Sequence, residues 1–378
     1  MQDLAATGLY LGRVWRPEVE GPSLVTLRRG RVIDITSRAA PTMSGLLEQP
    51  DLAGRIRGMD GEDLGPLTAL LTARPNLDQT HLLAPNDLQA IKACGVTFAR
   101  SMVERVIEER AAGDPDRAGA IRTRVVAVIG DSLRGLVPGS DKAAEVKALL
   151  QAEGLWSQYL EVGIGPDAEV FTKAPPMAAV GYGADVGLHP ISRWNNPEPE
   201  VVLAVNSHTR IVGATLGNDV NLRDVEGRSA LLLGKAKDNN ASAAIGPFIR
   251  VFDDTFTLDD VRQAVVSLRV EGTDGFVLDG HSSMAEISRD PADLAAQTCG
   301  RHHQYPDGFM LYCGTMFAPV QDRDGPGQGF THHLGDVVTV SSPGLGSLRN
   351  VVRLATECPE WRFGTGALMR NLAARRLI

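Results

Sequence analysis

The chain has 378 residues, of which 43% are hydrophobic, and it carries 38 basic against 46 acidic side chains. A net charge of −8 provides no attraction for nucleic acid or an anionic membrane surface, and no apolar run reaches the roughly 20 residues of a membrane span. We therefore expect no nucleic-acid or membrane role. Because the chain lacks a secretion signal and a C-x-x-C motif, we expect a soluble cytoplasmic protein with reduced cysteines.

The first part of the chain is predicted to form a small α+β unit. Alternating apolar residues predict strands at residues 9–15, 23–28 and 31–36, and a helix follows at residues 43–57. Turn signals then cluster around Pro75 and Pro85. We therefore predict two domains, a small α+β N-terminal domain at residues 1–80 and a larger catalytic domain at residues 81–378.

A helix is predicted at residues 98–113, where apolar residues recur at helical spacing. The opposite stripe is polar, because Thr97, Ser101, Glu104 and Glu108 recur at intervals of four, three and four residues and so share one face. This stripe is either a solvated surface or one wall of a site.

The chain changes character after residue 171, where short apolar runs are separated by Gly, Asn, Asp and Pro. Such regular spacing predicts a β-rich core. The expected strands are at residues 200–205, 210–216, 244–251, 264–270, 309–313 and 336–341.

Three carboxylates mark a candidate metal site. Glu198 and Glu200 stand two residues apart at the start of an apolar run, so on a strand their side chains point the same way. Asp219 can join them if the next strand returns alongside. Clustered carboxylates repel one another unless a cation neutralises them, and hard oxygen ligands suit Mg²⁺, Mn²⁺ or Ca²⁺. The alternative is a set of solvated surface acids.

Other candidate site residues lie on either side of these acids. Lys173 and Lys237 can hold a substrate carboxylate or act as an acid or base, and either can equally be a surface residue. Gly314 and Thr315 offer backbone N–H groups and a hydroxyl to a substrate carboxylate. The paired histidines at residues 302–303 and 332–333 lack the spacing of a zinc site, so we interpret them as loop residues.

In order and spacing, these signals resemble the fumarylacetoacetate hydrolase superfamily, from about residue 82 onward. The motifs that carry the resemblance are Leu82-Leu83-Ala84-Pro85, Gly95-Val96-Thr97-Phe98 with Glu104, Phe171-Thr172-Lys173, Glu198-Pro199-Glu200, Gly217-Asn218-Asp219 with Arg223-Asp224, Ala236-Lys237, Gly246-Pro247, Gly314-Thr315 and Gly335-Asp336.

The resemblance implies an α+β fold, with a mixed β-roll or barrel catalytic domain that binds Mg²⁺ or a similar cation and acts on 2-oxo acids. It places the metal ligands at Glu198, Glu200 and Asp219 and the active-site lysine at Lys237. It also implies that the protein forms a homodimer or homotetramer. The residues expected to contact substrate are Lys173, Gly314, Thr315 and Asn239, the last from the segment Lys235-Ala236-Lys237-Asp238-Asn239-Asn240.

One departure from the family pattern bears on the reaction. The carbon–carbon hydrolases carry a His-x-x-Glu pair on the lid helix, whereas here Ser101 precedes Glu104. A serine without a base activates water poorly, while a dehydratase needs no attacking nucleophile. Three further segments, Gly154-Leu155-Trp156-Ser157-Gln158-Tyr159-Leu160-Glu161-Val162-Gly163, Trp194-Asn195-Asn196-Pro197-Glu198-Pro199-Glu200 and Lys235-Ala236-Lys237-Asp238-Asn239-Asn240, resemble the sugar-acid dehydratases of oxidative pentose degradation. This resemblance implies conversion of 2-keto-3-deoxy-D-pentonate to 2-oxoglutarate semialdehyde. Lys237 or Glu104 is the expected base, and Glu104, Ser101 or water the expected acid.

Two other functions stay open at this point. A hydrolase of an acylpyruvate-type 2-oxo acid would need a histidine from elsewhere, such as His302 or His332. A catalytically silent, metal-dependent binder of 2-oxo acids would explain Ser101 as a decayed site. Retention of Glu104, both lysines and the three acids argues against decay, because packing alone requires none of them.

Overall fold

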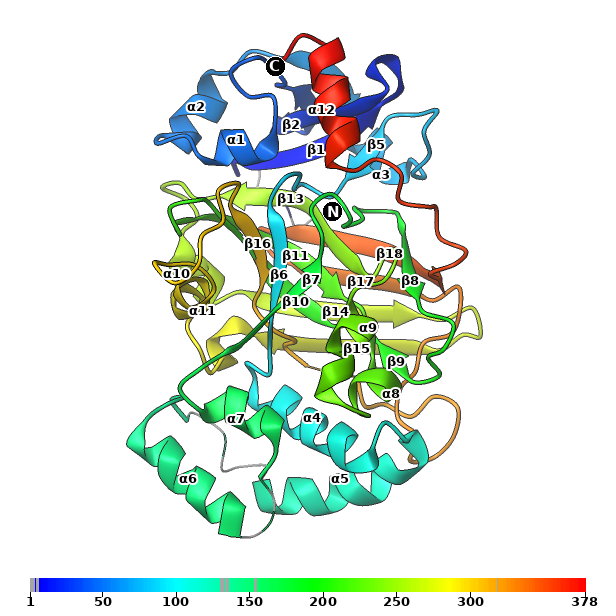
Figure 1. The fold of residues 1–378 in the computed structure, drawn as a ribbon. Coiled ribbons are helices and arrows are strands. Elements are labelled where there is room, and N and C mark those ends of the chain that lie inside the picture. Colours follow the sequence, from blue (N-terminus) through cyan, green and yellow to red (C-terminus); the bar gives the residue numbers. More distant parts are fainter. Residues whose placement is uncertain are drawn as a thin grey trace.

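The computed structural model describes residues 7–129, 136–152, 156–317 and 319–378, together with residues 4, 133 and 154. Three parts lie one above another in Figure 1: an N-terminal unit, a central body of strands, and a group of helices below it. Within these described ranges, no helix is both long and apolar enough to span a bilayer.

The N-terminal unit contains the three predicted strands, but its predicted helix is in fact two helices. Pro50 interrupts residues 43–57, and the carboxylate of Asp51 then accepts a hydrogen bond from Gly54 N and begins a new helix. The elements are β1 (Tyr10–Arg16), β2 (Gly21–Arg28), β3 (Arg31–Asp34), α1 (Met43–Leu47), α2 (Leu52–Gly58), β4 (Glu62–Pro66), α3 (Leu67–Thr72) and β5 (His81–Leu83), with a 3-10 turn at Pro17–Val19.

The central body contains the remaining strands, and those from β8 onward form the β-rich region predicted after residue 171. They are β6 (Ala90–Gly95), β7 (Glu169–Ala174), β8 (Asp185–Leu188), β9 (Asn195–Asn196), β10 (Pro199–Val205), β11 (Ile211–Asp219), β12 (Asn221–Leu222), β13 (Ala243–Val251), β14 (Val265–Glu271), β15 (Val277–Ser283), β16 (Phe309–Tyr312), β17 (Val337–Ser342) and β18 (Gly346–Leu354). Short helices lie between them, namely α8 (Arg223–Glu226), α9 (Leu233–Lys237), α10 (Leu258–Arg262) and α11 (Pro291–Thr298), with 3-10 turns at Ala230–Leu232 and Met284–Glu286.

Two large sheets are formed by these strands. One has eleven strands in the order β4-β3-β2-β1-β13-β11-β10-β16-β6-β7, with β5 paired to β1, and the other has five in the order β15-β14-β17-β18-β8. The main sheet runs from β4 to β7 without closing into a barrel. The predicted α+β class with a mixed catalytic sheet is confirmed, and the sheet is open.

The strand β10 is buried on both faces, which explains its unbroken apolar run. Val201, Leu203 and Val205 pack in the core that also contains residues of the five-stranded sheet, such as Leu268. Val202 packs in a second core that includes side chains of the N-terminal unit. The strand that carries Glu200 is therefore fixed from both sides.

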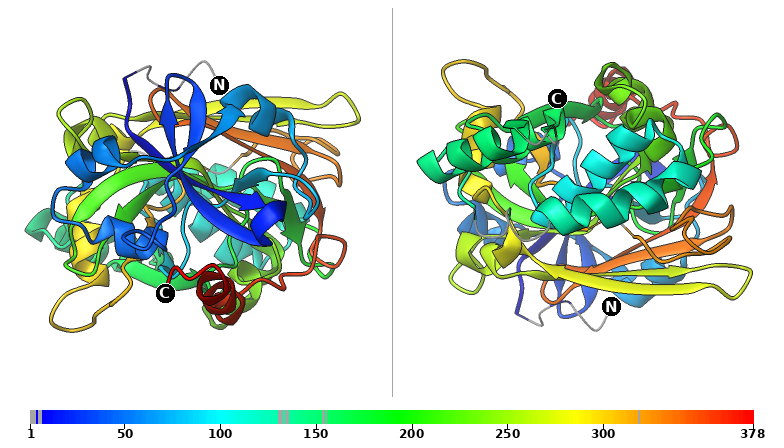
Figure 2. Two further views of the ribbon diagram at one scale, coloured as in Figure 1. Left: turned by 90° about the horizontal axis from the view of Figure 1, so that it is seen from above. Right: turned by 90° about the horizontal axis from the view of Figure 1, so that it is seen from below.

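The last helix of the chain packs against the N-terminal unit. Strand β1 pairs with β13, which joins this unit to the main sheet, and α12 (Thr365–Ala374) packs against β2. Arg375 donates a hydrogen bond to Pro22 O. Figures 1 and 2 show α12 beside the first strands. The division near residue 80 stays a prediction, and the two parts of that division share one sheet.

Four helices cover the other end of the body, as the lower part of Figure 1 and the right view of Figure 2 show. The predicted helix at residues 98–113 is confirmed as α4, whereas the sequence analysis made no prediction for the other three. Met102 and Val106 of α4 pack with Leu160 and with Trp194 from the body, so this face is core. The helices are α4 (Ala99–Ala111), α5 (Pro115–Ile129), α6 (Asp141–Ala152) and α7 (Gln158–Ile164).

Candidate active site

The three acids predicted as metal ligands come together where β10 begins and β11 ends. These strands are antiparallel, with Pro199 opposite Asn218, so Glu198 lies beside Asp219, whose N–H donates to Glu198 O at 3.0 Å. One oxygen from each of Glu198, Glu200 and Asp219 lies within 4.8 Å of the others, and all three residues are buried. The expectation that the next strand returns alongside is correct. The structure does not bear out the alternative of solvated surface acids.

Glu200 is held by Gly314 and Thr315. Its Oε2 accepts a hydrogen bond from Gly314 N at 2.7 Å, and its Oε1 lies 3.3 Å from Thr315 Oγ1. Gly314 has a φ of +100°, and a Cβ there would lie 2.1 Å from Oγ1 of Thr97. Glycine is required for this approach. The Gly314-Thr315 motif thus reaches the site through Glu200.

Both predicted lysines contact the acids. Lys237, at the end of α9, donates to Glu198 Oε2 and lies 3.1 Å from Asp219 Oδ2. Lys173 of β7 is buried with Nζ 2.7 Å from Asp219 Oδ1. Its Nζ also donates to the backbone oxygen of Val220 at 3.2 Å. Neither lysine is a surface residue.

The charges of this cluster are unevenly balanced. Burial by itself would raise the pKa of Glu198, but Lys237 and Arg105 outweigh that effect and lower it to about 2. Glu200 has only neutral donors, and burial together with repulsion by Asp219 and Glu198 holds its pKa well above the usual range. A positive charge beside Glu200 would relieve this repulsion.

The three clustered carboxylates fit a hard divalent cation, because a cation would relieve the repulsion at Glu200. Its donor atoms are all carboxylate oxygens, which suit Mg²⁺, Mn²⁺ or Ca²⁺. Among the described residues it is the one group of three or more His, Cys, Asp and Glu side chains close enough to share an ion. Lys237 supplies positive charge between Glu198 and Asp219, so a cation at the cluster would compete with this ammonium group.

A small cavity opens beside the acids. Its volume is about 10 Å³, room for about one water molecule, so side chains must move before a substrate can enter. Residues that are far apart in the sequence line it, namely Cys94, Gly95, Val96, Ser101, Arg105, Glu169, Phe171, Glu198, Asp219, Glu226, Lys237 and Thr315.

Glu169 is a functional candidate that the sequence analysis missed. It begins β7 and pairs with Gly95 of β6, where a Cβ would lie 1.8 Å from Glu169 Oε2. Burial, with repulsion by Glu226, raises the pKa of Glu169 to about 7. A usable signal was its position four residues before Lys173 on one strand, because alternate residues share a face.

Arg105 and Glu226 were also missed. The guanidinium of Arg105, on α4, contacts Glu198 Oε1 and Glu108 Oε2 and lies 3.3 Å from Glu226 Oε2. Arg223 reaches the other oxygen of Glu108 at 3.1 Å. This buried network ties α4 and α8 to the metal-ligand candidates. Its members lie far apart in sequence, and no local motif joins them.

Three predicted site residues have other contacts in this structure. Glu104 forms two hydrogen bonds to Arg122 of α5, at 2.8 and 3.1 Å, and does not line the cavity. Asn239 donates to Lys235 O at 3.0 Å in the turn after α9, also away from the cavity lining. Ser101 does line the cavity, and its Oγ donates to Phe98 O at 2.8 Å.

The histidines and cysteines lie as the sequence indicated. His302 is exposed with Nε2 3.2 Å from Gln297 O, and His332 is buried with Nδ1 3.0 Å from Asp336 Oδ2. Neither is among the residues that line the cavity. The cysteines are all free and buried, at Cys94, Cys299, Cys313 and Cys358.

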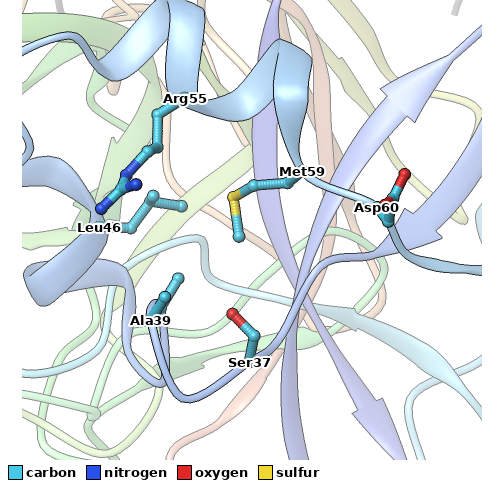
Figure 3. Close-up of a pocket in the computed structure, with 7 residues that line it drawn as sticks. Ser37, Ala39, Leu46, Arg55, Met59 and Asp60 are labelled. Atoms are coloured by element: carbon cyan, nitrogen blue, oxygen red, sulfur yellow. The ribbon is translucent and has the colours of Figure 1, made fainter.

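A second, larger cavity lies in the N-terminal unit beside α2 (Figure 3). The side chains of Leu46 and Met59 make it largely apolar, and its charged lining residues are Arg55 and Asp60, both exposed. Its lining contains no cluster of buried acids, so the smaller cavity is the candidate active site.

Comparisons with known proteins agree with this geometry. Residues 161–353 match the family described as fumarylacetoacetate (FAA) hydrolase C-terminal. The chain is 30% identical over 194 residues to a "Probable 2-keto-3-deoxyxylonate dehydratase" of Haloferax volcanii, covering 51% of this chain and 63% of that protein. It is 27% identical over 188 residues to a "2-dehydro-3-deoxy-D-arabinonate dehydratase" of Saccharolobus solfataricus, covering 49% and 58%.

A solved structure shares the fold over most of the chain. It is described as 2-keto-3-deoxy-D-arabinonate dehydratase complexed with magnesium and 2,5-dioxopentanoate. The TM-score is 0.62 at 19% identity, covering 91% of this chain and 99% of that one. The matched segment, the open mixed sheet and the acidic cluster together show that the chain belongs to the fumarylacetoacetate hydrolase family. Its sequence matches span about three fifths of the length of the two curated relatives.

Proposed function

We propose that the chain is a metal-dependent dehydratase that converts a 2-keto-3-deoxy-D-pentonate, of the xylonate or arabinonate type, to 2-oxoglutarate semialdehyde. The observation that carries this proposal is the lining of the small cavity. It combines Glu198 and Asp219, two of the proposed metal ligands, with Glu169, a carboxyl group of raised pKa, and none of its described lining residues is a histidine. The names of the two curated relatives support the same reaction.

In this proposal Glu198, Glu200 and Asp219 hold Mg²⁺, for which Mn²⁺ or Ca²⁺ can substitute. The cation would draw electron density from the C2 carbonyl of a bound 2-oxo acid and make the C3 protons more acidic. Thr315 lines the cavity beside Glu200, where its hydroxyl can contact the substrate carboxylate. Lys173 fixes the orientation of Asp219.

Glu169 is the group best suited to move protons. A carboxyl group with a pKa of about 7 is part ionised at neutral pH, so it can both take and return a proton. As a carboxylate it removes a C3 proton, and the C4–O bond then breaks. The proton on Glu169 goes to the departing hydroxyl, which leaves as water and a C3–C4 double bond remains.

The second half of the reaction is an isomerisation that the same carboxylate can serve. It removes a proton from C5 and delivers it to C3, which moves the double bond to C4–C5. The resulting enol tautomerises to the aldehyde. Lys237 is suited to a different task, because Asp219 and Glu198 raise its pKa although burial lowers it. As an ammonium group it stabilises negative charge on the substrate oxygen.

Glu104 and Ser101 take supporting roles in this scheme. Glu104 positions α5 against α4 through Arg122. The hydroxyl hydrogen of Ser101 is donated to a backbone carbonyl, so Ser101 is not a proton donor in this arrangement. The expected cytoplasmic location and the homodimer or homotetramer stay predictions.

Hydrolysis of an acylpyruvate is the competing reaction. The histidines considered as activators of water in that reaction, His302 and His332, have partners outside the cavity, and the names of the two curated relatives support dehydration. A silent 2-oxo-acid binder would not need a titratable group such as Glu169 beside the metal-ligand candidates. The dehydratase therefore remains our conclusion.

The proposal is tested by following aldehyde formation from 2-keto-3-deoxy-D-pentonate with an aldehyde-trapping reagent. Activity should disappear with EDTA and return with excess Mg²⁺. No aldehyde from the Mg²⁺-loaded protein, at any pH from 6 to 9, would overturn it.

A further inference from the structure

The cavity has a part that the proposed chemistry leaves unassigned. Glu198, Asp219, Lys237 and Thr315 belong to the end where a 2-oxo acid would meet the cation, and Glu169 is assigned to proton transfer. Ser101 of α4 and Glu226 of α8 also line the cavity, and each is only 4% exposed. Two buried polar side chains are therefore available to the tail of the substrate.

Both side chains present hydrogen-bond acceptors. Ser101 Oγ gives its hydrogen to Phe98 O at 2.8 Å and keeps its lone pairs for another group. A carboxylate such as Glu226 only accepts, and Arg105 Nη1 lies 3.3 Å from its Oε2. The donors of Arg105 are directed at the carboxylates Glu198 and Glu108 as well.

Acceptors select a ligand that donates. The hydroxyl groups of a sugar acid carry hydrogens that can be given to Ser101 and Glu226, whereas the tail carbonyl of an acylpyruvate has none. A carbonyl oxygen placed against a carboxylate is repelled and leaves the buried acceptor unpaired. The part of the cavity lined by Ser101 and Glu226 would thus favour hydroxylated 2-oxo acids over acylpyruvates.

We infer that Ser101 and Glu226 accept hydrogen bonds from the hydroxyl groups of the substrate tail and so select hydroxylated 2-oxo acids. This inference rests on the proposed function, because it assumes that the 2-oxo acid end of the ligand lies at Glu198, Glu200 and Asp219. It assigns to Ser101 a role in substrate recognition.

The test compares two unreactive ligands as inhibitors of 2-keto-3-deoxy-D-pentonate turnover. One is 2-oxopentanoate, which has no hydroxyl group, and the other is 5-hydroxy-2-oxopentanoate. The wild type should bind the hydroxylated ligand about tenfold more tightly. In Ser101→Ala the ratio of the two inhibition constants should fall toward one. In Glu226→Gln it should fall in part, because the neutral amide oxygen accepts a weaker hydrogen bond than the carboxylate does. A ratio removes any general loss of binding, so a merely structural role would leave it unchanged.

Matched variants serve as controls. Ser288→Ala removes a serine whose Oγ also donates to a backbone carbonyl, Thr97 O at 2.8 Å, away from the cavity lining. Glu104→Gln removes a carboxylate that is also paired with an arginine. Both controls should keep the wild-type ratio. If calorimetry shows no unfolding transition for Glu226→Gln, that variant is not folded. Ser101→Ala then tests the inference alone.

The outcomes separate this inference from the proposed function. If the wild type dehydrates the sugar acid but binds both inhibitors equally, or if both variants keep the wild-type ratio, the inference is wrong and the dehydratase stands. If the sugar acid is not dehydrated, the proposed function fails first. Calorimetric binding of the two ligands then still tests whether Ser101 and Glu226 favour the hydroxylated ligand.

Discussion

Gly95 of β6 and Glu169 of β7 are paired across neighbouring strands, and a methyl group on Gly95 would lie 1.8 Å from Oε2 of Glu169. The obstructed atom is the end of a flexible side chain, so Gly95→Ala should turn the carboxylate away at little cost in stability. We predict that kcat falls at least about a hundredfold while the free energy of unfolding changes by less than about 1 kcal/mol. Steady-state kinetics and denaturant unfolding measure both.

A control for this variant is Gly58→Ala, because a Cβ at Gly58 meets no atom within 4 Å. It should leave both quantities unchanged. Full activity in Gly95→Ala would mean that the position of the Glu169 carboxylate does not matter to the reaction.

The raised pKa of Glu169 predicts a pH dependence of stability. Its folded-state pKa of about 7 exceeds the ordinary value of 4.5, so the folded protein binds the proton more tightly than the unfolded chain. Stability should therefore fall between pH 4.5 and 7 by up to about 3 kcal/mol, and Glu169→Gln should remove this loss. Urea unfolding at several pH values checks the sign, and a steeper loss in the variant would contradict it.

The same group predicts the pH profile of the rate. If ionised Glu169 takes the C3 proton, log kcat/KM should rise with pH up to about 7 and then level off. Glu169→Gln should lower kcat/KM by about a hundredfold or more and remove this limb. If the rise of log kcat/KM with pH persists unchanged in the variant, the titration of another residue causes it.

Metal binding can be tested apart from catalysis. Mg²⁺ that binds only the folded protein should raise Tm in proportion to the logarithm of its concentration. Glu200→Ala should abolish this rise because it removes a ligand, while Glu360→Ala, which removes an exposed carboxylate paired with Arg362, should keep it. A full Mg²⁺ response in Glu200→Ala would exclude the ligand assignment.

Glu104 is the residue for which sequence and structure point to different tasks. Its two hydrogen bonds to Arg122 predict that Glu104→Gln loses about 1–3 kcal/mol of stability and little of its kcat. A double-mutant cycle with Arg122→Gln measures the coupling. If kcat instead fell a hundredfold with stability intact, Glu104 would return to the acid–base role.

The parts of the site that the sequence revealed are those set by local spacing. Glu198 and Glu200 are two residues apart, and Asp219 follows from the antiparallel return of β11, so strand geometry alone joins them. Gly314 could be named from its motif, although its contact with Glu200 depends on the positive φ seen only in the structure.

The rest depended on packing that no local pattern encodes. Arg105 and Glu226 come from helices more than a hundred residues apart, and they meet because α4 lies across the end of the body. The predicted helix at residues 43–57 failed because a prolyl residue, Pro50, outweighed the helical periodicity on either side. The open sheet, shared by the N-terminal unit and the body, could not be foreseen because it pairs β1 with the distant β13.

The central claim is that this site removes water from a sugar acid and does not hydrolyse a carbon–carbon bond. The most direct measurement is product analysis by mass after the Mg²⁺-loaded protein acts on an equimolar mixture of 2-keto-3-deoxy-D-pentonate and acetylpyruvate, with an EDTA control. We predict that the sugar acid loses one water molecule and acetylpyruvate persists, and that EDTA stops the reaction. Pyruvate released from acetylpyruvate, with the sugar acid intact, would contradict the claim and identify a hydrolase.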